Sequence, residues 1–172
     1  MRVSPVGWAF DTRERVLAEA AASAAFSHDH SEGIKGAQAT ALAIWLARHG
    51  ASKAEIREDI ETTFDYDLQR TVDQIRPEYC FDVSCQGSVP EAIICFLDSI
   101  SWEDAVRNAV SLGGDADTQA CIAGGIAEAF YGPVGEEVVR EVKERLTPDL
   151  WEVTRRFGER YLKVKKPRDP AH

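Results

Sequence analysis

Apolar residues recur every three or four positions along most of the chain, which is the spacing that gives an α-helix one buried stripe. Val16, Leu17, Ala20 and Ala24 form the first such stripe. The pattern predicts helices at roughly Thr12 to Phe26, His30 to His49, Lys53 to Thr63, Asp65 to Ile75, from Ser88 onward, Trp102 to Leu112, Ala120 to Tyr131, Gly135 to Arg145, and from Thr147 onward.

The ends of these helices are marked by ordinary capping residues. Ser52 with Glu55 forms a capping box, Ser101 precedes another helix, and Asp29 with Glu32, or Ser31 alone, suits the start of the helix that runs to His49. Met1 to Phe10 is interpreted as an interior loop and Glu78 to Gly87 as an extended connection. With no credible sheet, the chain is predicted to be all-α, a compact orthogonal multi-helix bundle.

One stretch combines helix punctuation with possible chemistry. Gly113 and Gly114 can adopt positive φ values and turn the chain sharply before Asp115, Asp117 and Thr118. In a non-helical turn these three side chains can converge, and three hard oxygen donors suit Mg²⁺ or Mn²⁺. The alternative is that Asp115 only caps the next helix. From residue 120 to 131 that helix carries one charge, Glu128, so we expect it inside the bundle.

Composition narrows the classes of partner. The chain has 172 residues, 44% hydrophobic and 28% charged, and a net charge of −9, so we expect no binding to a nucleic-acid backbone and no membrane partner. Four cysteines without a C-x-x-C pair are read as reduced thiols of a cytoplasmic protein. Two weaker alternatives stay open: zinc held through Cys80 and Cys85, and a transition metal held by His28 and His30.

Four stretches together resemble the ADP-ribosylglycohydrolase family, and they occur in the family's order over about residues 1 to 132. They are MRVSPVG from Met1, HDHSEGIKGAQA from His28, SCQGSVPEAIICFL from Ser84 and GGDADT from Gly113. The last is the most specific of them. The resemblance implies an all-α fold that hydrolyses the glycosidic bond joining ADP-ribose to a protein side chain or another acceptor, in a cleft with two Mg²⁺ or Mn²⁺ ions.

By this resemblance Asp115, Asp117 and Thr118 are expected metal ligands, and Asp115 and Asp117 expected catalytic residues. His28 and Gly114 are expected to contact the substrate, ADP-ribose or an ADP-ribosylated protein. The family's Thr-Asp-Asp-Thr motif has no counterpart here, so we expect the C-terminal portion of such a protein, without its N-terminal helices. The expected organisation is one partial domain over residues 1–162 and a flexible basic tail over residues 163–172.

Because the predicted ion site is half complete, the activity is expected to be incomplete in this chain alone. The chain would then need a complementing N-terminal half or form a homo-oligomer. Two alternatives are a catalytically inactive remnant that serves as a helical interaction module, and a helical domain that binds its ligand without a metal. The sequence leaves open the acceptor and the choice between Mg²⁺ and Mn²⁺.

Overall fold

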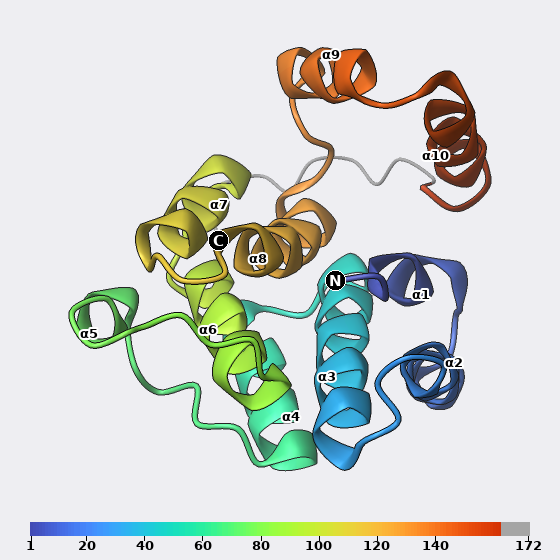
Figure 1. Ribbon diagram of the computed structural model, residues 1–172. Helices are drawn as coiled ribbons and strands as arrows, with labels where there is room; N and C mark the ends of the chain where they lie inside the picture. Colours follow the sequence, from blue (N-terminus) through green and yellow to red (C-terminus); the bar gives the residue numbers. More distant parts are fainter. Residues whose placement is uncertain (163–172) are drawn as a thin grey trace. The chain divides into compact units, whose positions relative to one another are not determined.

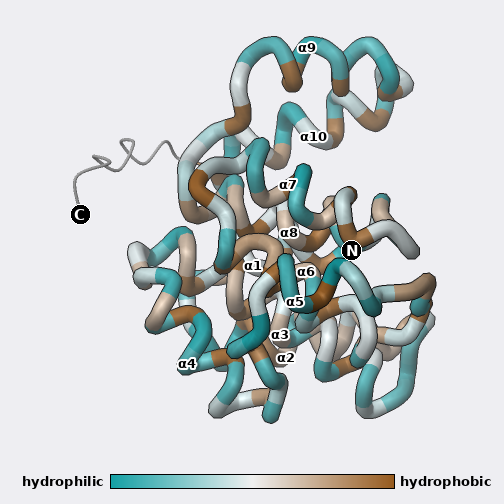
Figure 2. The backbone as a smooth tube through the Cα atoms, turned by 90° about the vertical axis from the view of Figure 1, so that its left-hand side faces the viewer, coloured by the Kyte–Doolittle hydropathy of each residue, from teal (hydrophilic) through white to brown (hydrophobic). Residues whose placement is uncertain are grey.

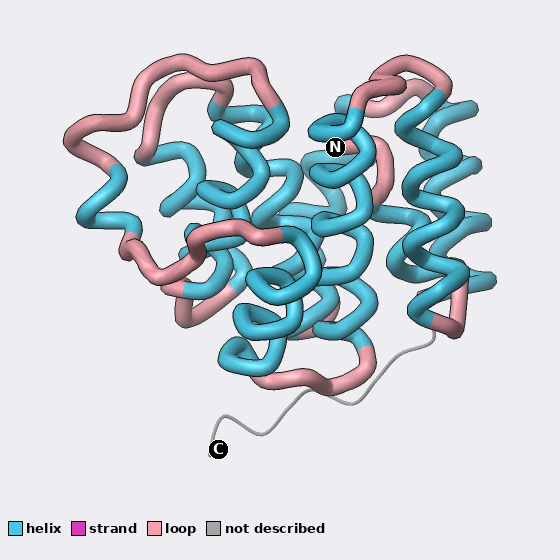
Figure 3. The backbone as a smooth tube through the Cα atoms, turned by 90° about the horizontal axis from the view of Figure 1, so that it is seen from below, coloured by secondary structure: helices cyan, strands magenta, loops and turns pink. Residues whose placement is uncertain are grey.

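The computed structural model describes residues 1–162, and the predicted basic tail at 163–172 lies outside them. All regular structure in the described residues is helical, as predicted (Figure 3). The chain forms two compact units, Met1–Phe130 and Tyr131 onward, and the single domain predicted over residues 1–162 stays a prediction. The helices are α1 (Ser4–Ala9), α2 (Arg13–Ala25), α3 (Ser31–Arg48), α4 (Lys53–Phe64), α5 (Val72–Ile75), α6 (Cys85–Leu97), α7 (Trp102–Ser111), α8 (Ala116–Tyr131), α9 (Glu136–Arg145) and α10 (Pro148–Tyr161).

Helix α3 is the centre of the first unit. It packs against α1 and α2 on one side and against α4 and α6 on the other (Figure 1). Its middle, residues 39 to 44, is buried around the whole circumference, and Ile44 is fully buried. Small residues allow this close packing: a Cβ on Gly7 of α1 would lie only 2.7 Å from Ile44 Cβ. Helix α3 therefore holds α1, α2, α4 and α6 at fixed positions around it.

Helix α8 lies inside the first unit, as its apolar sequence predicts. Ile122, Ala123, Ile126 and Ala127 are at most 2% exposed. A Cβ on Gly124 would lie 3.2 Å from Val106 of α7, so only glycine leaves that neighbour in place. The start of α8 is thus fixed by a buried helix, which matters because the candidate metal ligands lie there.

Two predicted segments differ from the structure. Residues 4 to 9 form α1 instead of the predicted interior loop, because Pro5 suits a helix's first turn and the helix packs on α3. The predicted helix from Asp65 to Ile75 is wrong over its first half. Asp65 ends α4 in the left-handed region at φ 53°, and Glu61 Oε1 then accepts a hydrogen bond from Leu68 N at 2.9 Å. Side-chain acceptors thus replace the helical hydrogen bonds before α5.

Three helix starts also differ. Helix α8 begins at Ala116 instead of Ala120, because the Asp115 carbonyl oxygen already accepts a helical hydrogen bond from Gln119 N. Helix α6 begins at Cys85 instead of Ser88, because Ser84 Oγ accepts the hydrogen bond of Gly87 N at 3.1 Å. Helix α3 is capped by His30, whose Nδ1 accepts from Glu32 N at 3.2 Å, and not by Asp29 or Ser31. Ser52 and Ser101 cap α4 and α7 as predicted.

The second unit contains α9 and α10. Both begin where Gly135 and the Thr147–Pro148 pair predict, although the Thr147 side chain makes no cap hydrogen bond. Along α9 the tube in Figure 2 changes between hydrophilic and hydrophobic colours, as expected for an amphipathic helix. Within the unit, Lys143 Nζ lies 5.6 Å from the centre of the Trp151 ring. Among residues 1–162, no helix is both long enough and apolar enough to span a membrane.

Candidate functional site

A pocket of about 500 Å³ in the first unit brings four separate parts of the sequence together. It is bordered by the first residues of the chain, the start of α3 with the residues before it, the start of α6 and the start of α8. His28, Asp115 and Thr118 all line it, so three of the predicted site residues share one pocket. The other lining residues are Met1, Arg2, Val3, Ala24, Gly33, Gly36, Ala37, Thr40, Val83, Ser84, Cys85, Ser88, Val89 and Ile122.

The start of α8 is formed by the predicted Gly-Gly turn. Gly113 and Gly114 take φ values of 77° and 65°, in the left-handed region that favours glycine. Asp115 then occupies the cap position of α8, because its carbonyl oxygen accepts the first helical hydrogen bond, from Gln119 N at 3.1 Å. The side chain of Asp115 is half-buried at the pocket. The capping role and the predicted ligand role therefore fall on the same residue.

The carboxyl groups of Asp115 and Asp117 lie close together. The interaction with the Asp115 side chain, together with a hydrogen bond from Thr118 N at 2.9 Å, lowers the pKa of Asp117 below its ordinary value. Two carboxyl groups at such a distance repel each other unless a proton or a cation lies between them. The predicted non-helical turn is wrong for Asp117 and Thr118, because α8 already begins at Ala116 and both residues lie in its first turn. Asp117 interacts with Asp115 but does not line the pocket, so the convergence of all three side chains on one ion stays a prediction.

This donor set fits part of a hard cation's coordination shell. Two carboxylates and the Thr118 hydroxyl are oxygen ligands of the kind that Mg²⁺ and Mn²⁺ prefer. Within residues 1–162, no group of three or more histidine, cysteine, aspartate or glutamate side chains is placed to hold a metal ion. Asp115, Asp117 and Thr118 would therefore supply at most three of the six ligands that such a cation prefers.

His28 lies in the connection between α2 and α3. Its Nδ1 is 2.8 Å from Ser27 Oγ, and His28 is one of the residues that line the pocket. The connection passes tightly over α3, because a Cβ on Gly33 would lie 2.7 Å from the His28 carbonyl oxygen. His30, by contrast, uses its Nδ1 to cap α3. Of these two histidines, only His28 lines the 500 Å³ pocket.

Gly114 does not line the pocket. A Cβ at this position would lie 2.9 Å from Tyr79 Cε1 and 3.3 Å from Phe81 Cα, so the missing side chain makes room for the segment before α6. This conformational role is visible in the structure. The predicted contact of Gly114 with substrate stays a prediction.

Ser84 and Ser88 line the pocket but were given no site role from the sequence, and Cys85 was considered only as a possible zinc ligand. Arg2 is the only arginine or lysine among the lining residues, and Ser84, Cys85 and Ser88 form the wall supplied by α6. They fall within the stretches that carry the family resemblance, which was the available signal. The four cysteines are unpaired, as predicted, with Cys85 half-buried at the pocket.

Comparison with known proteins identifies the family of this chain. The family model for ADP-ribosylglycohydrolase matches residues 1–169. ADP-ribosylhydrolase ARH3 of Homo sapiens is 28% identical over 177 residues, covering 77% of this chain and 49% of the relative. The Danio rerio ARH3 is 29% identical over 178 residues, with 77% and 48% covered. The chain spans about half the length of the curated relatives it matches. Because the family model covers nearly the whole chain, the protein belongs to the ADP-ribosylglycohydrolase family.

Proposed function

We propose that this chain acts in hydrolysis of the glycosidic bond between ADP-ribose and a protein side chain or another acceptor. The observation that carries the proposal is the single pocket lined by His28, Asp115 and Thr118 in a member of this family. Its volume of about 500 Å³ lies in the range of small-molecule and cofactor sites. The relatives named ADP-ribosylhydrolase support the same class of substrate.

We further propose that Asp115, Asp117 and Thr118 hold Mg²⁺ or Mn²⁺. The support is the paired carboxyl groups and the neighbouring hydroxyl at the start of α8. When bound, such an ion supplies a fixed positive charge that orients ribose oxygens and makes water more acidic. We propose that a complete site would hold two such ions, as the family resemblance implies.

The chain's own residues would divide the remaining work. His28 would orient the ribose or phosphate by hydrogen bonding, and Arg2 would neutralise phosphate charge, since it is the one guanidinium at the pocket. The carboxylates Asp115 and Asp117 would stabilise the positive charge that develops on the ribose as the glycosidic bond breaks. The wall formed by Val83 to Val89 would exclude water from one side of the sugar.

The direct test is an assay in which the chain is incubated with an ADP-ribosylated peptide and Mn²⁺ or Mg²⁺. Chromatography then measures the free ADP-ribose that is released. Asp117→Asn should abolish release. Asp73→Asn is the matched control, because Asp73 is also an exposed acid in the first turn of a helix, but at α5 and outside the pocket. Equal release by both variants would count against the proposed role of the carboxylate pair.

The same assays also detect incomplete or absent catalysis by this chain. A chain that binds ADP-ribose but releases none from the peptide would act as a binding module or as one half of the activity. Light scattering after size-exclusion chromatography would show whether it forms the predicted homo-oligomer. A chain that binds neither ADP-ribose nor metal would contradict the proposed function.

A further inference from the structure

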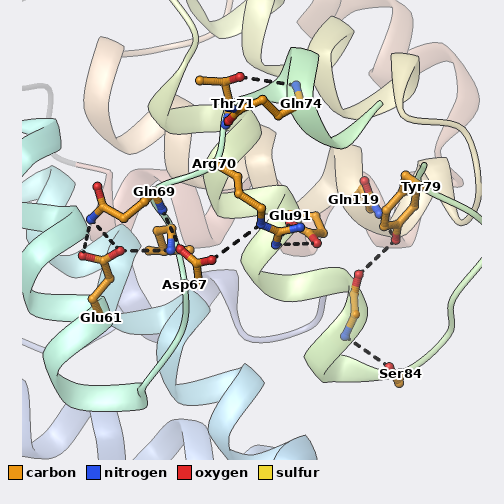
Figure 4. A network of polar contacts seen from close by, with 12 residues as sticks. Glu61, Asp67, Gln69, Arg70, Thr71, Gln74, Tyr79, Ser84, Glu91 and Gln119 are labelled. Atoms are coloured by element: carbon orange, nitrogen blue, oxygen red, sulfur yellow. Dashed lines mark hydrogen bonds and ion pairs between the residues drawn. The ribbon is translucent and has the colours of Figure 1, made fainter. Parts of the chain in front are cut away.

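Gln119 and Tyr79 form a part-buried connection between α8 and α6, two of the helices that border the pocket. Gln119 follows Thr118 on α8 and is fully buried. Its side-chain nitrogen donates a hydrogen bond to the Tyr79 hydroxyl. That hydroxyl in turn donates to the Gly87 carbonyl oxygen at 3.1 Å, in the first turn of α6 (Figure 4). One phenol group therefore joins the start of α8 to the start of α6.

The far end of this connection is part of the pocket wall. Gly87 N donates to Ser84 Oγ at 3.1 Å, and Ser88 Oγ donates to the Asp82 carbonyl oxygen at 2.9 Å. Ser84 and Ser88 both line the pocket. Figure 4 shows Gln119 beside Tyr79, and dashed lines that continue from the Tyr79 hydroxyl toward Ser84. A displacement of the Tyr79 hydroxyl would thus reach residues that face the ligand space.

The ring of Tyr79 makes a second contact with the candidate metal-binding turn. Its Cε1 atom occupies the space next to Gly114, where a Cβ would lie only 2.9 Å away. Burial raises the pKa of the Tyr79 hydroxyl, so it stays protonated and keeps both its donor and its acceptor roles at neutral pH. The side chain is therefore held by its ring on the turn and by its hydroxyl on both helices.

We propose that Tyr79 and Gln119 are positioning residues that fix the distance between Asp115–Thr118 on one wall of the pocket and Ser84–Val89 on the other. This inference rests on the proposed function for its meaning in ligand binding. Removing the hydroxyl leaves the Gln119 amide and the Gly87 carbonyl without their shared partner. The two helix starts then lose their direct polar link, and the ligand groups on them lose their alignment.

The test compares Tyr79→Phe with Tyr66→Phe. Both changes remove one phenol oxygen, from half-buried Tyr79 and from buried Tyr66, but the Tyr66 hydroxyl has no hydrogen-bond partner within the described residues, so its loss breaks no such connection. Hydrogen–deuterium exchange is followed in residues 84–89 and 113–119. Tyr79→Phe should speed exchange in both segments about three- to tenfold, the effect of losing one hydrogen bond, whereas Tyr66→Phe should leave both unchanged. Equal exchange in the two variants would overturn the proposal.

Ligand titration separates positioning from simple stabilisation. Well below the melting temperature, Tyr79→Phe should bind ADP-ribose with Mn²⁺ about three- to tenfold more weakly than the wild type, and Tyr66→Phe should bind like the wild type. Adding Gln119→Leu to Tyr79→Phe should cost little more, because one connection is broken twice. If Tyr79→Phe melts earlier but binds ADP-ribose normally, its role is structural and the proposal fails. If the wild type binds no ADP-ribose, the proposed function fails, while the exchange comparison still decides whether Tyr79 links the two walls.

Discussion

The two glycines before Asp115 provide a sharp internal comparison. Both have positive φ values, so replacing either by alanine forces a Cβ into the left-handed region, at a cost of about 1–2 kcal/mol. Their surroundings differ. A Cβ on Gly113 meets nothing within 4 Å, whereas a Cβ on Gly114 lies 2.9 Å from the Tyr79 ring. Since hydrogen bonds hold Tyr79 in place, crowding should add about 1–3 kcal/mol in Gly114→Ala alone.

Thermal unfolding followed by circular dichroism at about 222 nm measures this difference. At about 3 °C per kcal/mol for a chain of this size, Gly114→Ala should melt roughly 3–9 °C below Gly113→Ala. Equal melting temperatures would refute the reasoning that Tyr79 is fixed against the turn. A Gly114→Ala protein that melts like Gly113→Ala but fails to bind ADP-ribose would instead favour the substrate contact predicted for Gly114.

Two further predictions concern charge and pH. Burial raises the pKa of Glu128 above 4.5. Ionising Glu128 in the folded protein therefore lowers the free energy of unfolding as pH rises from the unfolded-state pKa through the folded-state pKa. Glu128→Gln should resist urea better than the wild type at pH 8 and equally well at pH 3. The hydrogen bond from Arg13 lowers the pKa of Asp59 below 3.8, so its stabilisation is present above pH 3.8 and is lost as pH falls through the folded pKa. Asp59→Asn should cost about 1 kcal/mol in urea unfolding at pH 7, and a cost that persists unchanged at pH 2 would contradict this assignment.

Local signals in the sequence were sufficient for most helices. Ser52 and Ser101 cap α4 and α7 because a hydroxyl oxygen and the backbone three residues later decide these starts by themselves. Helix α1 was missed because its six residues carry no periodic stripe and depend on Gly7 packing against Ile44, 37 positions further along the chain. The loop after Asp65 was missed because side-chain acceptors such as Glu61 replace its helical hydrogen bonds.

Some features of the candidate site could likewise be predicted from the sequence, and others could not. The sequence could indicate that Asp115 and Asp117 interact, because only one residue separates them at the start of α8. The place of His28 in the same pocket required the family resemblance, because 87 residues separate it from Asp115. Tyr79 and Gln119 gave no signal, since a tyrosine in a connection and a glutamine in a helix are ordinary on their own. Their contact arises only when the connection before α6 lies against the start of α8.

The central claim is that the carboxylate pair at the start of α8 binds ADP-ribose together with a divalent cation. The most direct measurement is calorimetric titration of the full chain with ADP-ribose. The wild type and Asp115→Ala/Asp117→Ala are each titrated twice, once in the presence of Mn²⁺ and once in the presence of a chelator. We predict binding by the wild type that weakens about tenfold or more with the chelator, and equally weak binding by the double variant in either condition. Binding of ADP-ribose with the same affinity in all four titrations would contradict the claim.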